Sequence, residues 1–125
     1  MAITIEIGGD KHKKHAIKIA EMIERASEKK GTILAIRKPN YILDKIIKGK
    51  SILALDGEII VGFCYFQNWE NNEFIAHSGL IINENYLGRG LSKKIKKQIF
   101  NLSRQKFPKA KLFGLTTSAA VMKIN

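Results

Sequence analysis

Apolar and polar residues alternate at the start of the chain and then change to a helical period. Apolar residues occupy every second position from residue 3 to residue 7, which is typical of a half-buried strand, and two glycines follow it. Asp10 is expected to cap the next element. There, apolar residues recur at helical spacing until Gly31: Ala16, Ile19, Ala20, Ile23 and Ala26. The chain is therefore expected to open with a strand and an amphipathic helix.

The middle of the chain predicts a short helix and then a β-hairpin. The helix is expected over residues 40–48. Two apolar segments, residues 51–55 and 59–67, flank the dipeptide Asp56-Gly57, whose tolerance of positive φ makes it a strong hairpin signal. A polar loop separates this hairpin from a third strand over residues 74–82. These segments predict three consecutive antiparallel strands.

The last third of the chain predicts a crossover. A polar loop and two glycines lead into a long helix, residues 91–107, and Pro108 ends it. The buried stripe of this helix is expected to be Leu91, Ile95, Ile99 and Leu102. A strand follows at residues 111–117 and a helical piece at 119–124. This order predicts one α/β domain over residues 1–125, with a mixed antiparallel and parallel sheet flanked by helices and a right-handed strand-helix-strand crossover.

Composition and charge narrow the classes of partner. Lys and Arg number 22 against 11 Asp and Glu, a net charge of +11, which favours an anionic ligand or partner. Four lysines crowd the opening turns of the long helix, where the macrodipole favours anions: Lys93, Lys94, Lys96 and Lys97. They form either a solvated face or part of an anion site. A second basic cluster, residues 11–15, is interpreted as a solvated helix start.

Several classes of protein are excluded by what the sequence lacks. No apolar run approaches the roughly 18 residues needed to span a bilayer, and no signal-peptide pattern opens the chain, so we expect no membrane association and a cytoplasmic protein. The single cysteine, Cys64, lies among Phe63, Tyr65 and Phe66 and is expected to be a buried, inert thiol. No cluster of His and Cys residues has metal-ligand spacing.

The junction between the third strand and the long helix carries the candidate chemistry. A strand that runs into a glycine loop and a helix start exposes several unpaired backbone N–H groups together, which can hold phosphate. Gly88 and Gly90 lack side chains, so the backbone can approach a pyrophosphate closely. Two glycines alone also fit a tight turn.

The run GLIINENYLGRGLSKKIKKQIF resembles the cofactor-binding segment of the GNAT acetyltransferase family. In that family an apolar strand end is followed by a polar loop, Gln or Arg, two residues, Gly, any residue, Gly or Ala, and a helix. The matching positions here are Leu80, Ile81, Ile82, Asn85, Gly88 and Gly90. Asn85 departs from the pattern because it is shorter than Gln or Arg. The order of elements from Ile3 onward agrees with the family, so the resemblance implies a GNAT-like fold.

The resemblance implies an N-acetyltransferase that uses acetyl-CoA or another short acyl-CoA as co-substrate. A primary amine would attack the thioester directly, and no activated Ser or Cys nucleophile is visible in the chain. The pantetheine arm would bond to the backbone of Leu80, Ile81 and Ile82. The cofactor's phosphates would be held at the loop and helix start, by Asn85, Leu87, Gly88, Arg89, Gly90, Leu91, Ser92 and Lys93. Lys94 or Lys97 would be an alternative to Lys93 for the remaining phosphate.

Two residues of the third strand region qualify as the general base that deprotonates the amine, Glu73 and His77. Strand alternation places both on one face with Ile75, although a bulge would change this parity. The alternatives are a solvated carboxylate for Glu73 and a satisfied polar residue between strands for His77.

The C-terminal part departs from the family pattern. Family members often place a tyrosine acid after the last matched strand, but no tyrosine follows Tyr86, and the chain stops at Asn125 before the family's usual final strands. Such a short C-terminus would leave an open sheet edge at residues 111–115 and favours pairing with a partner chain, as in a homodimer.

The acceptor is expected to be a small-molecule amine. The final segment LFGLTTSAAVMKIN resembles that of bacterial family members associated with amino-acid acetylation, which implies an α-amino acid. Two other functions remain open: a catalytically inactive acyl-CoA-binding regulator, and a basic nucleic-acid-binding module. No recognition-helix, zinc or interleaved aromatic signature supports the second, so we expect no nucleic-acid partner.

Overall fold

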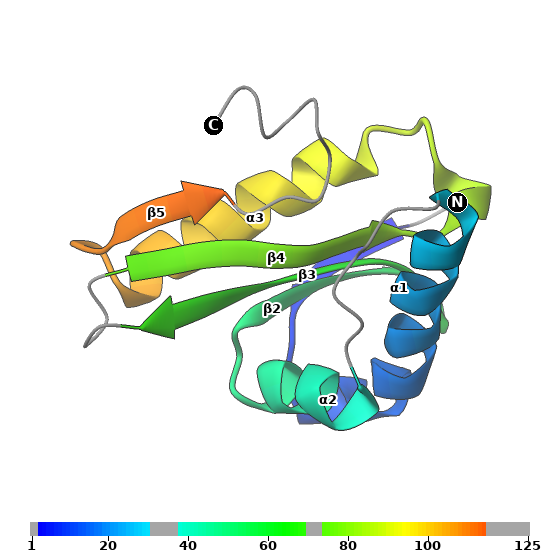
Figure 1. Ribbon diagram of the computed structural model, residues 1–125, viewed down its shortest axis with the longest axis horizontal. Helices are drawn as coiled ribbons and strands as arrows, with labels where there is room; N and C mark the ends of the chain where they lie inside the picture. The colour runs from blue at the N-terminus through cyan, green and yellow to red at the C-terminus, as the bar shows by residue number, and fades with distance from the viewer. Residues whose placement is uncertain (1–2, 31–37, 70–73, 115–125) are drawn as a thin grey trace.

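The computed structural model describes residues 3–30, 38–69 and 74–114, without the side chains of residues 27–30, 69 and 111–114. The elements, in chain order (Figure 1), are β1 (Ile3–Ile7), the 3-10 helix η1 (Asp10–His15), α1 (Ala16–Lys30), α2 (Pro39–Ile47), β2 (Ser51–Asp56), β3 (Ile59–Trp69), β4 (Phe74–Ile82), the 3-10 turn η2 (Glu84–Tyr86), α3 (Leu91–Lys106) and β5 (Lys111–Gly114). The predicted helices and strands of the described ranges are thereby confirmed to within two residues at most ends. The predicted piece over residues 119–124 and the end of the last strand lie outside the described residues.

The strands form one sheet in the order β1-β2-β3-β4-β5. β1 to β4 pair antiparallel, and β5 pairs parallel with β4, so the prediction of a mixed sheet is confirmed. The β2–β3 hairpin turns at Gly57, whose φ of +62° is the left-handed conformation that the sequence predicted there.

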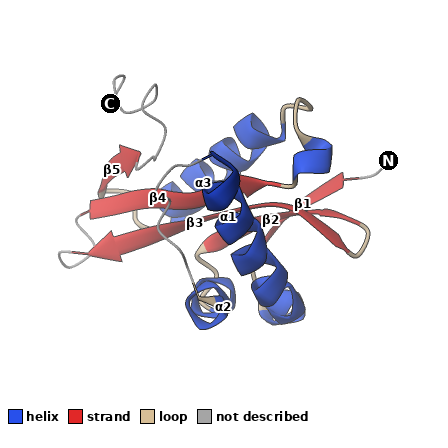
Figure 2. Cartoon of the chain, turned by 45° about the vertical axis from the view of Figure 1, so that its right-hand side comes forward, coloured by secondary structure: helices blue, strands red, loops and turns tan. Residues whose placement is uncertain are grey.

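Helices cover both faces of the sheet: α1 and α2 lie on one side and α3 on the other (Figure 2). The alternation of β2 shows why, because Leu53 and Leu55 pack under α1 and α2 whereas Ile52 and Ala54 pack under α3. The apolar stripe predicted for α3 is buried as expected, with Leu91, Ile95, Ile99 and Leu102 each at most 5% exposed. The sheet therefore separates two hydrophobic cores.

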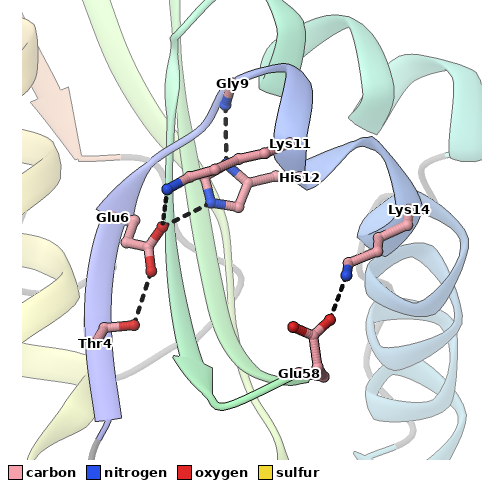
Figure 3. Close-up of polar contacts among 7 residues, drawn as sticks. All are labelled: Thr4, Glu6, Gly9, Lys11, His12, Lys14 and Glu58. Atoms are coloured by element: carbon pink, nitrogen blue, oxygen red, sulfur yellow. Dashed lines mark hydrogen bonds and ion pairs between the residues drawn. The ribbon is translucent and has the colours of Figure 1, made fainter.

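The N-terminal helix starts differently from the prediction. Asp10 does not cap α1, because residues 10–15 form a 3-10 helix whose N-cap is Gly9. The Gly9 N–H donates to Nδ1 of His12 at 3.0 Å, and His12 Nε2 lies 3.0 Å from Oε1 of Glu6 (Figure 3). Since Nδ1 accepts, Nε2 carries the ring proton and donates to the Glu6 carboxylate. His12 thus ties this turn to β1.

The basic cluster at residues 11–15 is only partly the solvated face that was expected. Lys11, Lys13 and Lys14 are exposed and pair with carboxylates, whereas His12 and His15 are buried. Hydrogen bonds from His12, Lys11 and Thr4 lower the pKa of Glu6 to about 2, with His12 contributing most. Burial lowers the pKa of His15. The cluster fastens η1 to the sheet.

β4 contains a bulge that changes which face its side chains occupy. Tyr65 of β3 pairs with Ser78, but Phe63 pairs with Ile81, so two residues of β4 stand opposite one of β3. Gly79, with φ of +66°, lies in this bulge, and a Cβ there would sit 2.4 Å from the Tyr65 ring. Before the bulge Ile75 packs in the α3 core, and after it Leu80 does, which simple alternation would not allow.

No helix in the described ranges is both long enough and apolar enough to cross a bilayer.

Candidate functional site

The site is built on the loop that joins β4 to α3. Asn83 caps the turn η2, with its side-chain oxygen accepting from the Asn85 N–H at 3.0 Å. After the turn, Gly88 and Gly90 adopt φ values of +80° and +75°, and Gly90 is the N-cap of α3. Because L-residues rarely adopt this conformation, both glycines are required by the backbone path itself.

This loop presents backbone to solvent. A Cβ added at Gly88 or Gly90 would meet no heavy atom of the described residues within 4 Å, so none of them would hinder the approach of a ligand to the main chain there. In α3 the Lys94 N–H donates to the Gly90 carbonyl at 3.3 Å, while the N–H groups of the three residues before Lys94 have no helical acceptor. The first turn of α3 therefore offers three N–H groups without a helical acceptor at the positive end of the helix dipole, directly after the glycine loop.

The side chains of Tyr86 and Asp56 hold the loop in place, and the sequence did not predict this contact. The Tyr86 hydroxyl donates to Asp56 Oδ2 at 2.7 Å, which links the loop to the end of β2. This hydrogen bond to the carboxylate raises the pKa of Tyr86. The Arg89 guanidinium lies 5.0 Å from the centroid of the Tyr86 ring. Only the fold reveals the contact between Asp56 and Tyr86, because the two residues are 30 positions apart in the sequence.

The end of β4 is paired with a neighbouring strand on one side only within the described residues. On the β3 side it is paired, through Ile81 and Ile82, and the Asn83 N–H donates to the Val61 carbonyl at 2.8 Å. On the β5 side, pairing within the described residues ends at His77 and Gly114. In the part of the chain that the structure describes, the stretch 80–82 therefore has no strand beside it on that side.

A pocket of about 150 Å³ adjoins this strand end on the α1 side. Four of its lining residues come from α1, and the others come from the end of β4 and the loop: Lys18, Met22, Arg25 and Ala26, then Ile81, Ile82, Asn83, Glu84 and Asn85. Three of these residues, Ile81, Ile82 and Asn85, belong to the predicted cofactor-binding set. The α1 wall was not predicted, since a helix face alone does not reveal which strand end it meets.

The structure describes only one of the two predicted general bases. Glu73 lies outside the described residues. His77 lies on the α3 side of β4, the same face as Ile75 as the alternation predicted, and its Nε2 is 3.1 Å from the Ser103 hydroxyl oxygen. Ser103 donates its own proton to the Phe100 carbonyl at 2.9 Å, so it accepts from the ring, and the free lone pair of His77 is on Nδ1. Burial, aided by the charge of Arg104, lowers the pKa of His77 to about 4.

Cys64 takes no part in this site. The thiol is 2% exposed, burial raises its pKa to about 12, and its sulfur lies 3.4 Å from the Ser78 carbonyl oxygen. The prediction of a buried thiol is confirmed, and a thiol held protonated at neutral pH is a poor nucleophile. Among the described residues, no group of three or more His, Cys, Asp or Glu side chains is arranged to hold a metal ion.

Comparisons with known proteins address the fold. No family model matches the sequence, and the search of curated proteins gave no match. Solved structures do match. N-acetylglutamate synthase from Neisseria gonorrhoeae, complexed with coenzyme A and N-acetyl-glutamate, superposes with a TM-score of 0.75 at 17% identity, over 99% of this chain and 27% of that one. An acetyltransferase of the GNAT family from Streptococcus pneumoniae gives 0.70 at 12% identity, over 98% and 81%.

The chain has the GNAT acetyltransferase fold. A third neighbour, diaminobutyrate acetyltransferase from Paenibacillus lautus in complex with L-2,4-diaminobutyric acid and coenzyme A, has a TM-score of 0.65 at 13% identity, over 80% of this chain and 57% of that one. The chain spans about a quarter of the N-acetylglutamate synthase and little more than half of this enzyme.

Within the GNAT fold, the structure brings most of the predicted cofactor residues together at one end of the sheet. Leu80, Ile81 and Ile82 end β4, and Asn85, Leu87, Gly88, Arg89 and Gly90 form the loop, from which Leu91, Ser92 and Lys93 open α3. His77 lies further back along β4, beside α3.

Proposed function

We propose that this chain is an N-acyltransferase, a single GNAT domain that transfers an acetyl or other short acyl group from acyl-CoA to a primary amine. The observation that carries the proposal is the open glycine loop at the start of α3. Gly88 and Gly90 turn the chain with positive φ, and no residue that the structure describes occupies the space that a side chain would fill at either position.

The residues around this loop fit an anionic cofactor. Between residues 83 and 97 the chain carries five basic side chains and one acidic one. The N–H groups of Leu87 to Gly90 and of the first turn of α3 would hold the pyrophosphate, and Lys93, Lys94 or Lys97 would neutralise the remaining phosphate. Asn85 is exposed and its N–H is already engaged by Asn83, so its role rests on its side-chain amide.

The end of β4 would hold the pantetheine arm. Backbone groups of residues 80–82 that face away from β3 can accept and donate as a strand edge does, which positions the arm without any side chain. When bound, the thioester supplies an acyl group already activated toward an amine. The chain's own contribution is to orient and desolvate the reactants, which requires no protein nucleophile.

The general base remains a choice between Glu73 and His77. His77 lies on the α3 side of β4, across the sheet from the pocket beside α1, and its Nε2 is fixed on Ser103, which leaves only the Nδ1 lone pair to take a proton. Its pKa of about 4 keeps it deprotonated at neutral pH, although such a weak base provides little driving force for removing a proton from an ammonium group. This weakness favours Glu73, or a water chain that starts from either residue.

The acceptor that the pocket fits best is a small amine bearing a carboxylate, such as an amino acid. Lys18 and Arg25 lie one on each side of Met22 along α1, and these two cations, with Glu84 opposite, border an apolar wall formed by Met22, Ala26 and Ile81. A guanidinium binds a carboxylate through two parallel hydrogen bonds. The neighbours crystallised with N-acetyl-glutamate and diaminobutyric acid support the same class of acceptor.

The proposal is tested by a thermal-shift measurement with acetyl-CoA, desulfo-CoA and ATP. A ligand at 100 times its dissociation constant stabilises the folded state by about 2.7 kcal/mol, so acetyl-CoA should raise the melting temperature at submillimolar concentration. Acyl transfer to a mixture of amino acids is then followed by thiol release. If acetyl-CoA gives no shift while ATP gives one, the loop is a general phosphate site and the proposal is wrong.

A second candidate is an acyl-CoA-binding regulator without catalysis. One observation favours it, namely the engagement of His77 by Ser103 together with its low pKa. A melting shift with acetyl-CoA, combined with no thiol release for any amine tested, would support this candidate over the enzyme.

A further inference from the structure

The net positive charge of this chain lies almost entirely in its C-terminal third. The first 84 residues contain 12 Lys and Arg against 11 Asp and Glu, and are close to neutral. The remaining 41 residues contain 10 Lys and Arg and no acidic residue, so they carry nearly the whole net charge of +11. Such an asymmetry between two parts of one domain indicates an anionic partner for one side of the molecule.

The fold gathers much of this charge on α3. The helix has six basic residues and no acidic one, and its apolar stripe faces the sheet. Lys93, Lys97, Phe100 and Arg104 follow one another along the ridge opposite that stripe, with Lys94 and Lys96 beside them. The four lysines are exposed, and Arg104 lies 5.6 Å from the centroid of the Phe100 ring, which is 43% exposed.

Four lysines elsewhere in the molecule have partners of a kind that the exposed lysines of α3 lack. Lys11, Lys13, Lys14 and Lys48 each pair with a carboxylate. Within the described ranges, no carboxylate lies within ion-pair distance of the four exposed α3 lysines, Lys93, Lys94, Lys96 and Lys97. Their charge is therefore not neutralised by the described part of the chain.

The proposed cofactor accounts for only one end of this surface. A helix of 16 residues is about 24 Å long, and Arg104 lies about 20 Å along the axis from Leu91. A pyrophosphate at the loop contacts the first turn, and Lys109 lies beyond the far end of the helix. Past Lys97, the last residue that the cofactor is expected to touch, the ridge continues for about two turns to Arg104.

We propose that the outer face of α3 binds the phosphate backbone of a nucleic acid. A double helix carries one negative charge per about 1.7 Å of its axis, so it offers a regular row of charges over the whole length of α3. A membrane surface fits less well, because the apolar stripe of α3 is buried in the core and only Phe100 could insert. Lysine ammonium groups bind phosphates as point charges, which allows recognition of the nucleic-acid backbone without recognition of its base sequence.

This proposal departs from the expectation of no nucleic-acid partner, which rested on the lack of base-reading motifs. Backbone binding needs no such motif. It needs cations without carboxylate partners on one continuous surface, and among the described residues Lys93, Lys94, Lys96 and Lys97 of α3 are such cations.

The test uses the whole chain and a 20-base-pair duplex RNA, with binding followed by fluorescence anisotropy between 50 and 200 mM salt. Three basic residues away from the loop are replaced, in the variant K96Q/R104Q/K109Q. The logarithm of affinity should fall linearly with the logarithm of salt concentration. The slope for the variant should be smaller in magnitude by about 3, since each lost phosphate contact removes about 0.9. Acetyl-CoA binding should be unchanged.

The matched control is K13Q/K38Q/K48Q, which removes the same charge from the opposite side of the molecule and should keep the wild-type slope. Equal weakening by the two triple variants would show that only net charge matters, and would overturn the proposal. So would polyglutamate or anionic vesicles that compete as well as the RNA at equal charge concentration. Retained melting temperatures exclude unfolding as the cause of either loss.

Discussion

At the scale of single residues, the two loop glycines matter because of the side chains they lack. Gly88→Val or Gly90→Val would place a branched side chain where the cofactor's phosphates approach, in a backbone conformation that valine adopts poorly. We expect each to weaken CoA binding at least tenfold, about 1.4 kcal/mol, and Asn85→Ala to weaken it less. Isothermal titration calorimetry measures both.

The control is Gly57→Val, which imposes the same strain at a positive φ but in the β2–β3 hairpin. It should lower stability and leave CoA affinity intact. Normal CoA binding by both folded loop variants would mean that the loop is only a turn.

The assignment of the general base is also decided at single residues. Glu73→Gln or His77→Ala at the true base should lower turnover by about 10² to 10⁴-fold with little change in CoA affinity. The loss should shrink as pH rises, since more of the amine is then already deprotonated. Steady-state rates from pH 6 to 9.5 test this. Full activity of both variants at neutral pH would leave neither as the base.

The sequence predicted the loop residues because spacing alone carries that signal: Gly88 and Gly90 stand two apart between an apolar strand and a helix. It could not predict Tyr86–Asp56, nor the wall that Lys18 and Arg25 add, because these contacts join segments that only the folded sheet brings together. The same limit applied to His77, whose partner Ser103 lies on another element.

At the scale of elements, the bulge in β4 makes a specific demand on Gly79. In Gly79→Ala the new Cβ would overlap the buried Tyr65 ring and strain a φ of +66°. We expect a loss of roughly 2 to 4 kcal/mol in the free energy of unfolding, measured by urea denaturation.

Gly9→Ala is the matched control for this substitution. Gly9 is extended, with φ of −161°, and an added Cβ there would meet nothing within 4 Å. This variant should lie within about 0.5 kcal/mol of wild type. If the two variants are equally stable, the bulge can accommodate a side chain and the positive φ is not required.

Elements with a strong period were predicted well, and irregular ones were not. The hairpin at Asp56-Gly57 and the α3 stripe follow from local signals. The 3-10 helix at residues 10–15 was missed because its stability comes from His12, which bonds to Gly9 on one side and to β1 on the other. The Gly79 bulge was missed because a lone glycine in a strand does not specify where pairing shifts.

At the scale of the whole molecule, the buried His77 makes stability depend on pH. Its pKa is about 4 in the folded state and 6.5 when exposed, so the unfolded chain binds more protons between these values. Stability is thus present above pH 6.5 and is lost as pH falls toward 4. The slope from this one group cannot exceed about 1.4 kcal/mol per pH unit, because only one proton is bound, and the partial exposure of His77 reduces it further.

His77→Gln keeps a donor toward Ser103 but cannot titrate. Its free energy of unfolding should therefore fall less steeply than that of wild type between pH 6.5 and 4, in denaturant titrations at matched ionic strength. Parallel curves for the two proteins would show that His77 keeps an ordinary pKa. The His15 ring, whose pKa is also lowered, acts with the same sign in both proteins and cancels in the comparison.

The sheet lies between α3, which has six basic residues and no acidic one, and the helices α1 and α2, which together have five basic and four acidic residues. Opposed in this way, the two sides make the domain an electric dipole. In the field of a large polyanion such a body experiences a torque before it makes any contact, and it turns its α3 side toward the charge. The pocket beside α1 then faces outward, so that docking on one side would leave the other side open to small molecules.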